Sequence, residues 1–407
     1  MSEKIRENIQ SHLIALSKFT ETPGNGVTRL PFTKEGKNAA EYLKDQMKKS
    51  GLNVREDASG AVIGRLEGQS KKTVIIGSHY DSVKSGGEFD GIAGVVCGIE
   101  IARLFKEKNI KPKYSIEIFA TNDEEGVRFN SGFLSSKALL GEISIDELKS
   151  LADSNGITLY KAIENYGLNP EDFIKCKRDI EDIKAFLEIH IEQGPILENH
   201  KKEIGIVDTI VGMKRTMFSI KGRSDHAGTT PMNMRIDAVD IASKIISKVS
   251  YIALKYPNAV ATVGQIIVSP NSINTIAGEV NFSLDIRSTK KEHISSIYNE
   301  VFSLATEIVQ KYNADFTHED TLTVNPVNMN LELTKIIEES CKNKETSYEH
   351  INSGAGHDSL PIGEKIPTAM LFVPSRGGRS HCPEEFTDYK YLEKVTIITF
   401  DVINKII

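Results

Sequence analysis

Histidine and carboxylate side chains occur along the chain in a pattern that could bind metal ions. The stretch GSHYDSVKSGGEFDG, residues 77–91, contains His79, Asp81 and Asp90. Imidazole and carboxylate groups are the ligands that zinc and its first-row neighbours take in proteins. Asp81 lies close behind His79, where its side chain is expected to accept the second ring N–H and fix the tautomer. The glycines of this stretch let the loop turn tightly.

Three later segments, NDEEG, EIHIEQG and SRGGRSHCPEE, add groups of the same kind: Glu124, Glu125, His190 and His381. Adjacent residues at a strand end can point in different directions, so one carboxylate can bind a metal while its neighbour acts as a general base. Each segment alone is weak evidence, because an isolated histidine or a DEEG turn is more often structural. Their joint occurrence at strand ends and tight turns predicts a metal centre.

The segments that carry these residues alternate between strand-like and helix-like patterns. Strands are predicted at 73–78, 114–122 and 185–194, and a helix at 91–108. Strands separated by helices indicate a layered α/β fold with a mostly parallel sheet. Ligands bind such sheets at the carboxyl ends of the strands, which is where the histidines and glutamates occur. The segment PTAMLFVPS and a helix after Asp388 return to this pattern near the end of the chain.

Residues 208–322 have a different order of elements. A strand TMFSIKG is followed by a helix after Ile236, the strands VATVGQIIV and EVNFSLDIRS, and a helix at 291–312. This β-α-β-β-α order predicts a small α+β domain with an antiparallel sheet. We therefore expect a catalytic domain made of 1–207 and 323–407, with the α+β domain inserted between them.

The composition argues against several classes of protein. The chain has 407 residues, with 50 basic and 56 acidic side chains and a formal net charge of −6, which does not favour binding to nucleic acid. No apolar stretch is long enough for a membrane span, and the mixed-charge start MSEKIRENIQSHLIAL does not resemble a signal peptide. The cysteines are scattered without a CxxC pair, which predicts reduced thiols and a cytoplasmic location.

The chain carries, in order, the motifs GSHYDSVKSGGEFDGIAG, DEEGVRF, LEIHIEQGPILE, HAGTTPM, PNSINTIAGEVNFSLDIR, SGAGHD and SHCPEE. As a set they resemble the M20-type metal-dependent amidohydrolases, in the branch of allantoate amidohydrolases and N-carbamoyl-L-amino-acid hydrolases. The resemblance implies two divalent ions per subunit, zinc or manganese, with cobalt and nickel as alternatives. One ion would be held by His79, Asp90 and His190. The other would be held by Asp90, Glu125 and His381, with Asp90 bridging.

The same resemblance implies the catalytic groups and the assembly. Glu124 would be the general base, and His226 in SDHAGTTPM would stabilise the developing oxyanion. The inserted domain would act as a lid and form a homodimer. The substrate would be a small ureido acid, contacted by five residues outside the metal cluster: Gln193, Arg215, Asn274, Arg287 and Gly356.

The choice of substrate depends on a few of these residues. Arg287 has a planar guanidinium group that can donate two parallel hydrogen bonds to a substrate carboxylate. Arg215 lies where allantoate enzymes carry an arginine, and it favours allantoate, which has two ureido arms. N-carbamoyl-L-amino acids and β-ureidopropionate stay open as alternatives, since Ser135 and Ala277 depart from the residues usual in the branch. His357 and Asp358 are interpreted as structural.

Two other classes of protein compete with this interpretation. An aminoacylase or dipeptidase of the wider M20 group would share the metal ligands, but it would not explain the complete HIEQGP and HAGTTPM motifs. A non-catalytic binding protein on the same scaffold is expected to have lost the base or a ligand. Glu124 and all the ligand positions are present in this chain.

Overall fold

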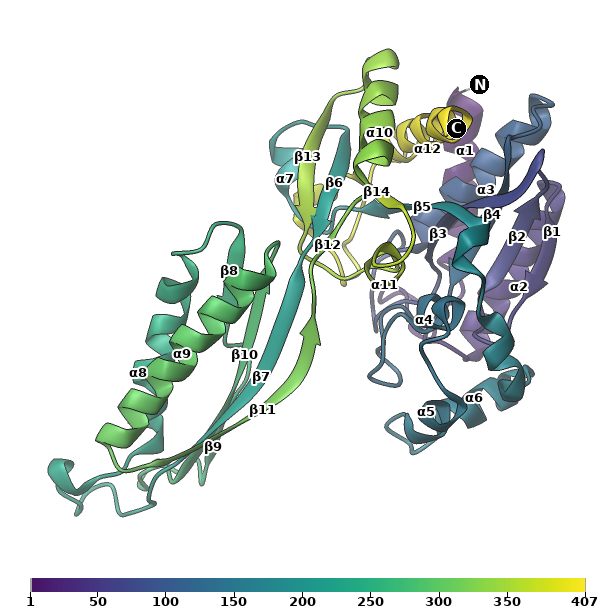
Figure 1. Ribbon diagram of the computed structural model, residues 1–407. Helices are drawn as coiled ribbons and strands as arrows, with labels where there is room; N and C mark the ends of the chain where they lie inside the picture. Colours follow the sequence, from purple (N-terminus) through teal and green to yellow (C-terminus); the bar gives the residue numbers. More distant parts are fainter. Residues whose placement is uncertain (1, 407) are drawn as a thin grey trace. The chain divides into compact units, whose positions relative to one another are not determined.

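The computed structural model describes residues 2–406 and divides into two compact units. The first unit runs through Asp208 and resumes at Asn328, and the second is Thr209–Val327 (Figure 1). The sequence placed the end of the insert at residue 322, whereas the second unit continues beyond it because strand β11 runs on to Val324. Among residues 2–406, no helix is both long and apolar enough to span a bilayer.

The first unit is a sheet with helices on both faces. Its helices are α1 (Ser2–Leu16), α2 (Lys34–Lys49), α3 (Ile92–Glu107), α4 (Leu134–Leu140), α5 (Ile145–Ser150), α6 (Leu159–Tyr166), α7 (Ile196–Asn199), α10 (Leu331–Asn343), α11 (Ser359–Gly363) and α12 (Tyr389–Lys405), with 3₁₀ turns η1 (Pro170–Cys176), η2 (Ile180–Asp182) and η4 (Arg376–Gly378). Its strands are β1 (Asn53–Glu56), β2 (Val62–Leu66), β3 (Ser70–His79), β4 (Tyr114–Thr121), β5 (Ile183–Ile191), β6 (Ile204–Ile210), β12 (Val327–Asn328), β13 (Tyr348–Ser353) and β14 (Thr368–Val373).

The strands of this sheet lie in the order β1-β2-β4-β3-β5-β14-β6-β12, with β13 also paired to β6. The central strands β4, β3, β5 and β14 are mutually parallel. The flanking pairs β1–β2, β2–β4 and β14–β6 are antiparallel. The layered α/β fold with a mostly parallel sheet, predicted from the sequence, is confirmed for the part of the chain that carries the metal-ligand candidates.

The apolar run of β3 explains why both faces of the sheet are covered. Val74 and Ile76 belong to the larger core, in which α1, α3 and α12 pack together (Figure 1). Ile75 points to the opposite face and joins a second cluster with Leu139 of α4 and Phe186 of β5. A strand buried on both faces reads as a continuous apolar stretch, because neither set of alternating side chains meets water.

The second unit has an antiparallel sheet packed against two helices. Its elements are β7 (Gly212–Lys221), η3 (Met232–Met234), α8 (Ala238–Ala253), β8 (Ala259–Thr262), β9 (Ile266–Ser269), β10 (Glu279–Ser288), α9 (Lys291–Lys311) and β11 (Asp315–Val324). The order is β11-β7-β10-β8, and β9 also pairs with β10. Alternate residues of β10, among them Phe282 and Leu284, are buried against these helices. The predicted α+β architecture is therefore correct.

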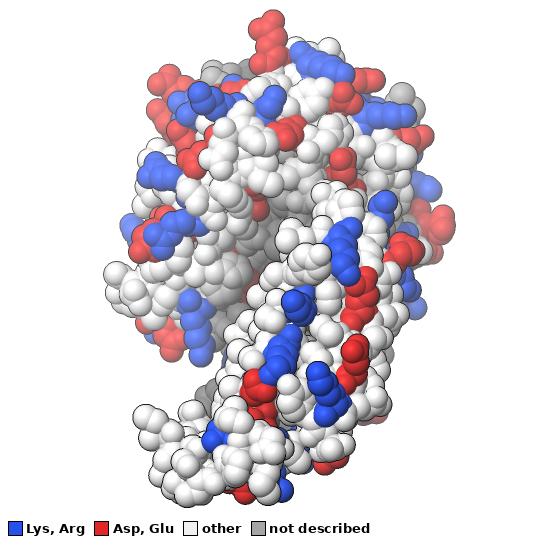
Figure 2. Space-filling model, turned by 90° about the vertical axis from the view of Figure 1, so that its left-hand side faces the viewer, with Lys and Arg blue, Asp and Glu red and all other residues white. Residues whose placement is uncertain are grey.

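Two details of this unit differ from the sequence prediction. Residues 260–268 form two strands rather than one, because the backbone N–H groups of Gly264 and Gln265 leave the ladder and donate to the Ser283 hydroxyl at 3.3 and 3.0 Å. Strand β11 was not predicted, since it is mostly exposed and polar and has little apolar alternation. Acidic and basic side chains are interspersed over the face of this unit seen in Figure 2. Lys255, just after α8, pairs with Glu300 of α9.

Candidate metal centre

The metal-ligand candidates of the first unit converge at one edge of its sheet. His79 is the last residue of β3, His190 lies near the end of β5, and the glutamate pair follows β4. His381 lies in the loop after β14, and Asp90 immediately precedes the glycine that caps α3. Because β3, β4, β5 and β14 are parallel, their carboxyl ends meet at the same edge and bring distant residues together.

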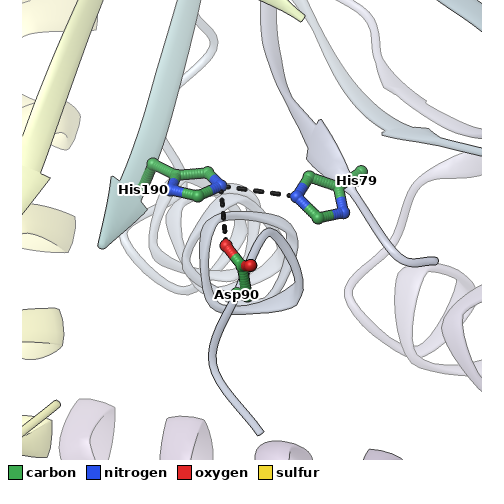
Figure 3. A group of neighbouring side chains, drawn as sticks. All are labelled: His79, Asp90 and His190. Carbon is green, nitrogen blue, oxygen red and sulfur yellow. Dashed lines mark hydrogen bonds and ion pairs between the residues drawn. The ribbon is translucent and has the colours of Figure 1, made fainter. Parts of the chain in front are cut away.

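Asp90 lies between two groups of possible ligands. On one side, His190 Nε2 is 3.3 Å from Asp90 Oδ1 and 3.4 Å from His79 Nε2 (Figure 3). On the other side, His381 Nε2 is 3.1 Å from Asp90 Oδ2 and 3.4 Å from Glu125 Oε1. These residues form the clusters His79–Asp90–His190 and Asp90–Glu125–His381, and each is compact enough for one ion. The two clusters share the carboxylate of Asp90.

The hydrogen bonds of the two buried histidines fit a cation. His79 Nδ1 faces the backbone carbonyl of Asp81 at 3.0 Å, and His190 Nδ1 faces that of Ile191 at 2.9 Å. A carbonyl oxygen only accepts, so each Nδ1 must carry a hydrogen. In the neutral ring, Nε2 then presents a lone pair toward the space beside Asp90. A metal ion could accept both of these lone pairs and bind the Asp90 carboxylate at the same time. Imidazole nitrogen and carboxylate oxygen are the donor types that zinc and related ions prefer.

The pKa values of the histidines reflect the negative charge of the cluster. Hydrogen bonds to Asp90 and Glu125 raise the pKa of His381 to about 11. Burial opposes protonation of His79, but the carboxylates around it, beginning with Asp81 and Asp90, raise its pKa to about 9. Burial lowers the pKa of His190. In the metal-free protein, His79 and His381 are therefore protonated at neutral pH. Their positive charges lie where a metal cation would bind.

We expect metal binding to release protons and to strengthen as the pH rises. His79 and His381 must lose their protons to act as ligands, and their pKa values of about 9 and 11 lie above neutrality. Between about pH 6 and pH 9 the apparent affinity should increase, because fewer protons compete with the ion. Calorimetric titration with Zn²⁺ in buffers of different ionisation enthalpy would measure the release. Binding without proton release would contradict this assignment.

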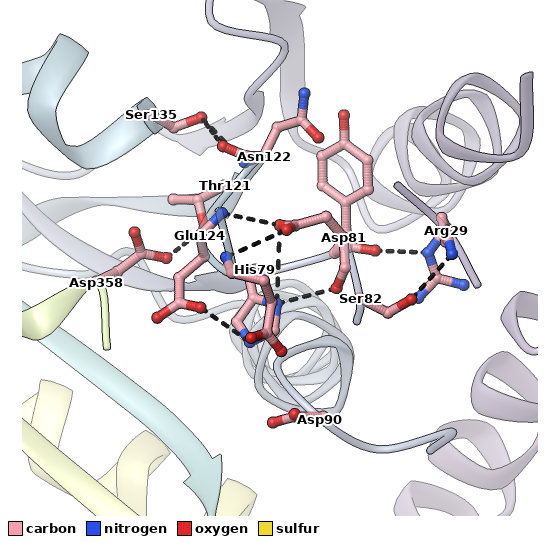
Figure 4. A network of polar contacts seen from close by, with 12 residues as sticks. Arg29, His79, Asp81, Ser82, Asp90, Thr121, Asn122, Glu124, Ser135 and Asp358 are labelled. Carbon is pink, nitrogen blue, oxygen red and sulfur yellow. Dashed lines mark hydrogen bonds and ion pairs between the residues drawn. The ribbon is translucent and has the colours of Figure 1, made fainter. Parts of the chain in front are cut away.

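Glu124 lies beside the cluster, and its backbone is held by Asp81. Glu124 Oε2 is 3.9 Å from His79 Nε2 (Figure 4). The Asp81 carboxylate accepts the backbone N–H groups of Glu124 at 3.1 Å and Glu125 at 3.3 Å. Burial, followed by the negative charges of Glu125 and Asp358, raises the pKa of Glu124 well above its ordinary value. A carboxylate with a raised pKa is suited to accept a proton and pass it on.

The role expected for Asp81 needs a correction. Its carboxylate was expected to accept the second ring N–H of His79, but Asp81 Oδ1 lies 3.8 Å from His79 Nδ1, beyond hydrogen-bond distance. The backbone carbonyl of Asp81 accepts that N–H instead. The carboxylate is occupied by the backbone of the glutamate pair. Asp81 thus orients the ligand and the candidate base at once, with two different groups.

Two features of the structure explain why residue 91 of this loop is a glycine. Its φ of +64° is a conformation that side chains rarely adopt. A Cβ at this position would also lie 2.3 Å from Nε2 of His79. A tight turn alone does not account for this glycine, because Gly91 also leaves space for the imidazole ring.

Two of the predicted substrate contacts lie in the first unit. Gln193 Nε2 donates to both oxygens of Asp90, at 2.9 and 3.1 Å, so this side chain reaches the metal cluster. Gly356 precedes His357, whose ring packs edge-on against His190 with centroids 4.4 Å apart. A Cβ on Gly356 would lie 2.8 Å from the ring of Phe133. Gly356 is therefore one residue away from a direct contact with a ligand candidate.

The other predicted functional residues lie in the second unit and form two groups. Arg215 and Arg287 both pair with Asp285, at 2.8 and 3.0 Å, on neighbouring strands β7 and β10. His226 and Asn274 lie on adjoining segments, since the N–H of Ala227 donates to the Asn274 carbonyl at 2.9 Å. His226 Nδ1 accepts the N–H of Gly228 at 3.0 Å. The neutral ring of His226 then carries its hydrogen on the exposed Nε2 side.

One buried acid near the cluster, Glu188, could not be singled out as a site residue from the motifs. Glu188 is fully buried in β5. Its Oε2 accepts from Ser359, while its Oε1 has no hydrogen-bond partner among residues 2–406. Burial raises its pKa to about 8. A carboxylate inside the apolar strand FLEIHI was a usable signal for such a residue. Asp358, by contrast, accepts from the hydroxyls of Thr121 and Ser136, in agreement with the structural role assigned to it.

Comparison with known proteins places the chain in a family. The sequence pattern of Peptidase family M20/M25/M40 matches residues 75–405. An N-carbamoyl-L-amino-acid amidohydrolase of Paenarthrobacter aurescens is 40% identical over 399 residues, 97% of each chain. An allantoate amidohydrolase of Bacillus subtilis (strain 168) is 35% identical over 392 residues, 96% of this chain and 95% of the relative. The crystal structure of a hydantoinase/carbamoylase family amidase from Burkholderia multivorans has a TM-score of 0.91 at 30% identity, covering 98% of this chain and 97% of that one.

The chain belongs to the M20 peptidase family, and its amidohydrolase relatives identify it as a metal-dependent hydrolase of carbon–nitrogen bonds other than peptide bonds.

Proposed function

We propose that this enzyme hydrolyses the carbon–nitrogen bond of a ureido group in a small carboxylic acid. The observation that carries the proposal is the shared Asp90, with one oxygen directed to His190 and the other to His381. Two ligand sets that overlap at one carboxylate suit a pair of divalent ions, which act as Lewis acids on a carbonyl group and on water. The proposed sets are His79, Asp90 and His190, and Asp90, Glu125 and His381.

Glu124 would carry the proton transfers. Its carboxylate accepts a proton from the attacking water as the C–O bond forms, and returns it to the nitrogen as the C–N bond breaks. The raised pKa of Glu124 brings its basicity nearer to that of the groups with which it exchanges protons. The backbone hydrogen bonds to Asp81 hold the segment that carries Glu124 in place.

The second unit would supply the contacts to the substrate carboxylate and the oxyanion. The planar guanidinium groups of Arg215 and Arg287, which both also pair with Asp285, would donate to the substrate carboxylate. The Nε2–H of His226 would donate to the oxyanion. In this proposal the inserted domain also serves as lid and dimerisation domain, which rests on the family resemblance.

Allantoate is the first candidate substrate, and N-carbamoyl-L-amino acids are the second. The Arg215 side chain is 46% exposed and has donors beyond its pair with Asp285, which suits a substrate with a second ureido arm. The second candidate is favoured by the N-carbamoyl-L-amino-acid amidohydrolase relative at 40% identity, compared with 35% for the allantoate enzyme. Both substrates share the ureido group and the carboxylate on which the proposed site depends.

A substrate panel tests this proposal. The protein is loaded with Zn²⁺, Mn²⁺, Co²⁺ or Ni²⁺ and incubated with allantoate, several N-carbamoyl-L-amino acids, β-ureidopropionate, an N-acetyl amino acid and a dipeptide, and released ammonia or free amine is measured. We expect turnover of ureido acids only, with allantoate fastest. Faster turnover of N-carbamoyl amino acids would reverse the ranking. Preferential cleavage of the dipeptide or the acetyl compound would refute the proposed ureido chemistry.

A further inference from the structure

The side chain of Glu385 joins two loops of the metal centre that are far apart in the sequence. Its Oε1 accepts the backbone N–H groups of Phe89 at 3.1 Å and Asp90 at 2.9 Å. Its Oε2 accepts the hydroxyl of Ser380 at 2.8 Å, next to His381. Glu385 is 4% exposed, so water does not replace these bonds easily. One buried carboxylate therefore fixes the backbone of the shared ligand and the loop of a second ligand.

The loop that carries Asp90 leaves space for this carboxylate. A Cβ at Gly87 would lie 2.1 Å from Oε1 of Glu385, closer than any real contact. A larger residue at Gly87 would therefore displace the side chain of Glu385. On the other side, His381 has a φ of +56°, a conformation that needs support from its surroundings.

We propose that Glu385 is a positioning residue of the metal centre. Its carboxylate holds Asp90 and the His381 loop at the separation at which both can bind the same ion. The side chain itself is not counted as a ligand, because Glu385 belongs to none of the possible ligand clusters found among the described residues. This inference rests on the metal centre of the proposed function. Residues that orient metal ligands contribute about 10–100-fold to metal affinity or activity.

The test compares metal affinity among variants that differ only at this contact. Co²⁺ is titrated into the metal-free protein, and binding is followed by its visible absorption, whose shape also reports the coordination geometry. We expect Glu385→Ala to bind about 10–100-fold more weakly, with an altered spectrum. Glu385→Gln keeps an oxygen that can accept both backbone N–H groups, so it should remain within a few-fold of wild type. Glu384→Ala is the matched control, since Glu384 is exposed and pairs only with Arg379 among the described residues.

A double variant separates positioning from a general effect on folding. Gly87→Ala alone should weaken Co²⁺ binding, because its Cβ displaces an intact Glu385. Glu385→Gly alone should bind Co²⁺ about as weakly as Glu385→Ala. Added to Glu385→Gly, Gly87→Ala should cost little further, because the Oε1, Cδ and Cβ atoms of Glu385 that its Cβ would meet are all gone. Additive losses, or wild-type binding by Glu385→Ala, would overturn the role of Glu385 while leaving the metal centre intact. Failure of the wild-type chain to bind Co²⁺ would overturn the proposed metal centre itself, and this inference with it.

Discussion

The variant Glu124→Gln is expected to lose about 10²–10⁴-fold in kcat while it keeps its metal. Glutamine has the shape of glutamate but cannot accept the proton from the attacking water. The ligand sets built around Asp90 do not include Glu124, so metal binding should persist. The backbone N–H of residue 124 still donates to Asp81, and the local fold should be retained. Initial rates on the best ureido substrate and metal content by mass spectrometry measure the two effects separately.

A suitable control for this variant is Glu142→Gln, because Glu142 is exposed and pairs with Lys365 on the surface of the same unit. It should have wild-type kcat and metal content. Wild-type turnover by Glu124→Gln would refute the assignment of the base. Loss of one metal equivalent would instead indicate that Glu124 is a ligand, which the third possible cluster of His79, Glu124 and Glu125 also allows in geometric terms.

The positions of the metal-ligand candidates could be predicted from the sequence because the rules involved are local. Apolar runs identify buried strands, and the polar residues that end them must lie at one edge if the strands are parallel. This is why His79, His190 and the glutamate pair, which are separated by long stretches of chain, could be expected to meet. The strand order itself needed the structure.

The contacts that orient these residues could not be predicted, because they use backbone atoms and long-range packing. The carbonyl of Asp81, and not its carboxylate, accepts from His79, and no sequence pattern distinguishes the two groups. Glu385 contacts Asp90 across 295 positions of the chain. The edge strand β11 could not be predicted, because most of its residues are exposed and packing against a core does not require an alternating apolar pattern in them. The sequence thus indicated which groups are candidates for the metal centre, while their orientation required coordinates.

For the candidate substrate residues of the second unit, too, the residue types could be predicted from the sequence but their contacts could not. Arg287 could be singled out from the sequence as a fork for a carboxylate. That Asp285 is shared by Arg287 and Arg215 follows only from the register of β7 against β10, in which Asp285 lies opposite Arg215. The sharing of Asp285 by two arginines is a property of the paired strands and not of either segment alone.

The variant His226→Ala is expected to lose about 10²–10³-fold in kcat, with little change in metal content. Its Nδ1 accepts the N–H of Gly228, which leaves Nε2–H as the donor of the neutral ring. A donor directed at a charge that develops only in the transition state affects kcat more than KM. His226 lies in the second unit, so its removal should leave the cluster around Asp90 and the Co²⁺ absorption spectrum unchanged. Initial rates over a range of substrate concentrations give kcat and KM, and the absorption spectrum of the Co²⁺-loaded variant reports on the metal centre.

The control for His226→Ala is His318→Ala, an exposed histidine of β11 in the same unit, which should retain wild-type kcat. His226→Gln restores a side-chain N–H donor near the same place, and partial recovery of kcat over the alanine variant would support hydrogen bonding by the ring. Normal turnover of His226→Ala would reject the oxyanion role. A rise in KM with unchanged kcat would assign His226 to ground-state binding of the substrate, because the interaction would then be equally strong before and during the reaction.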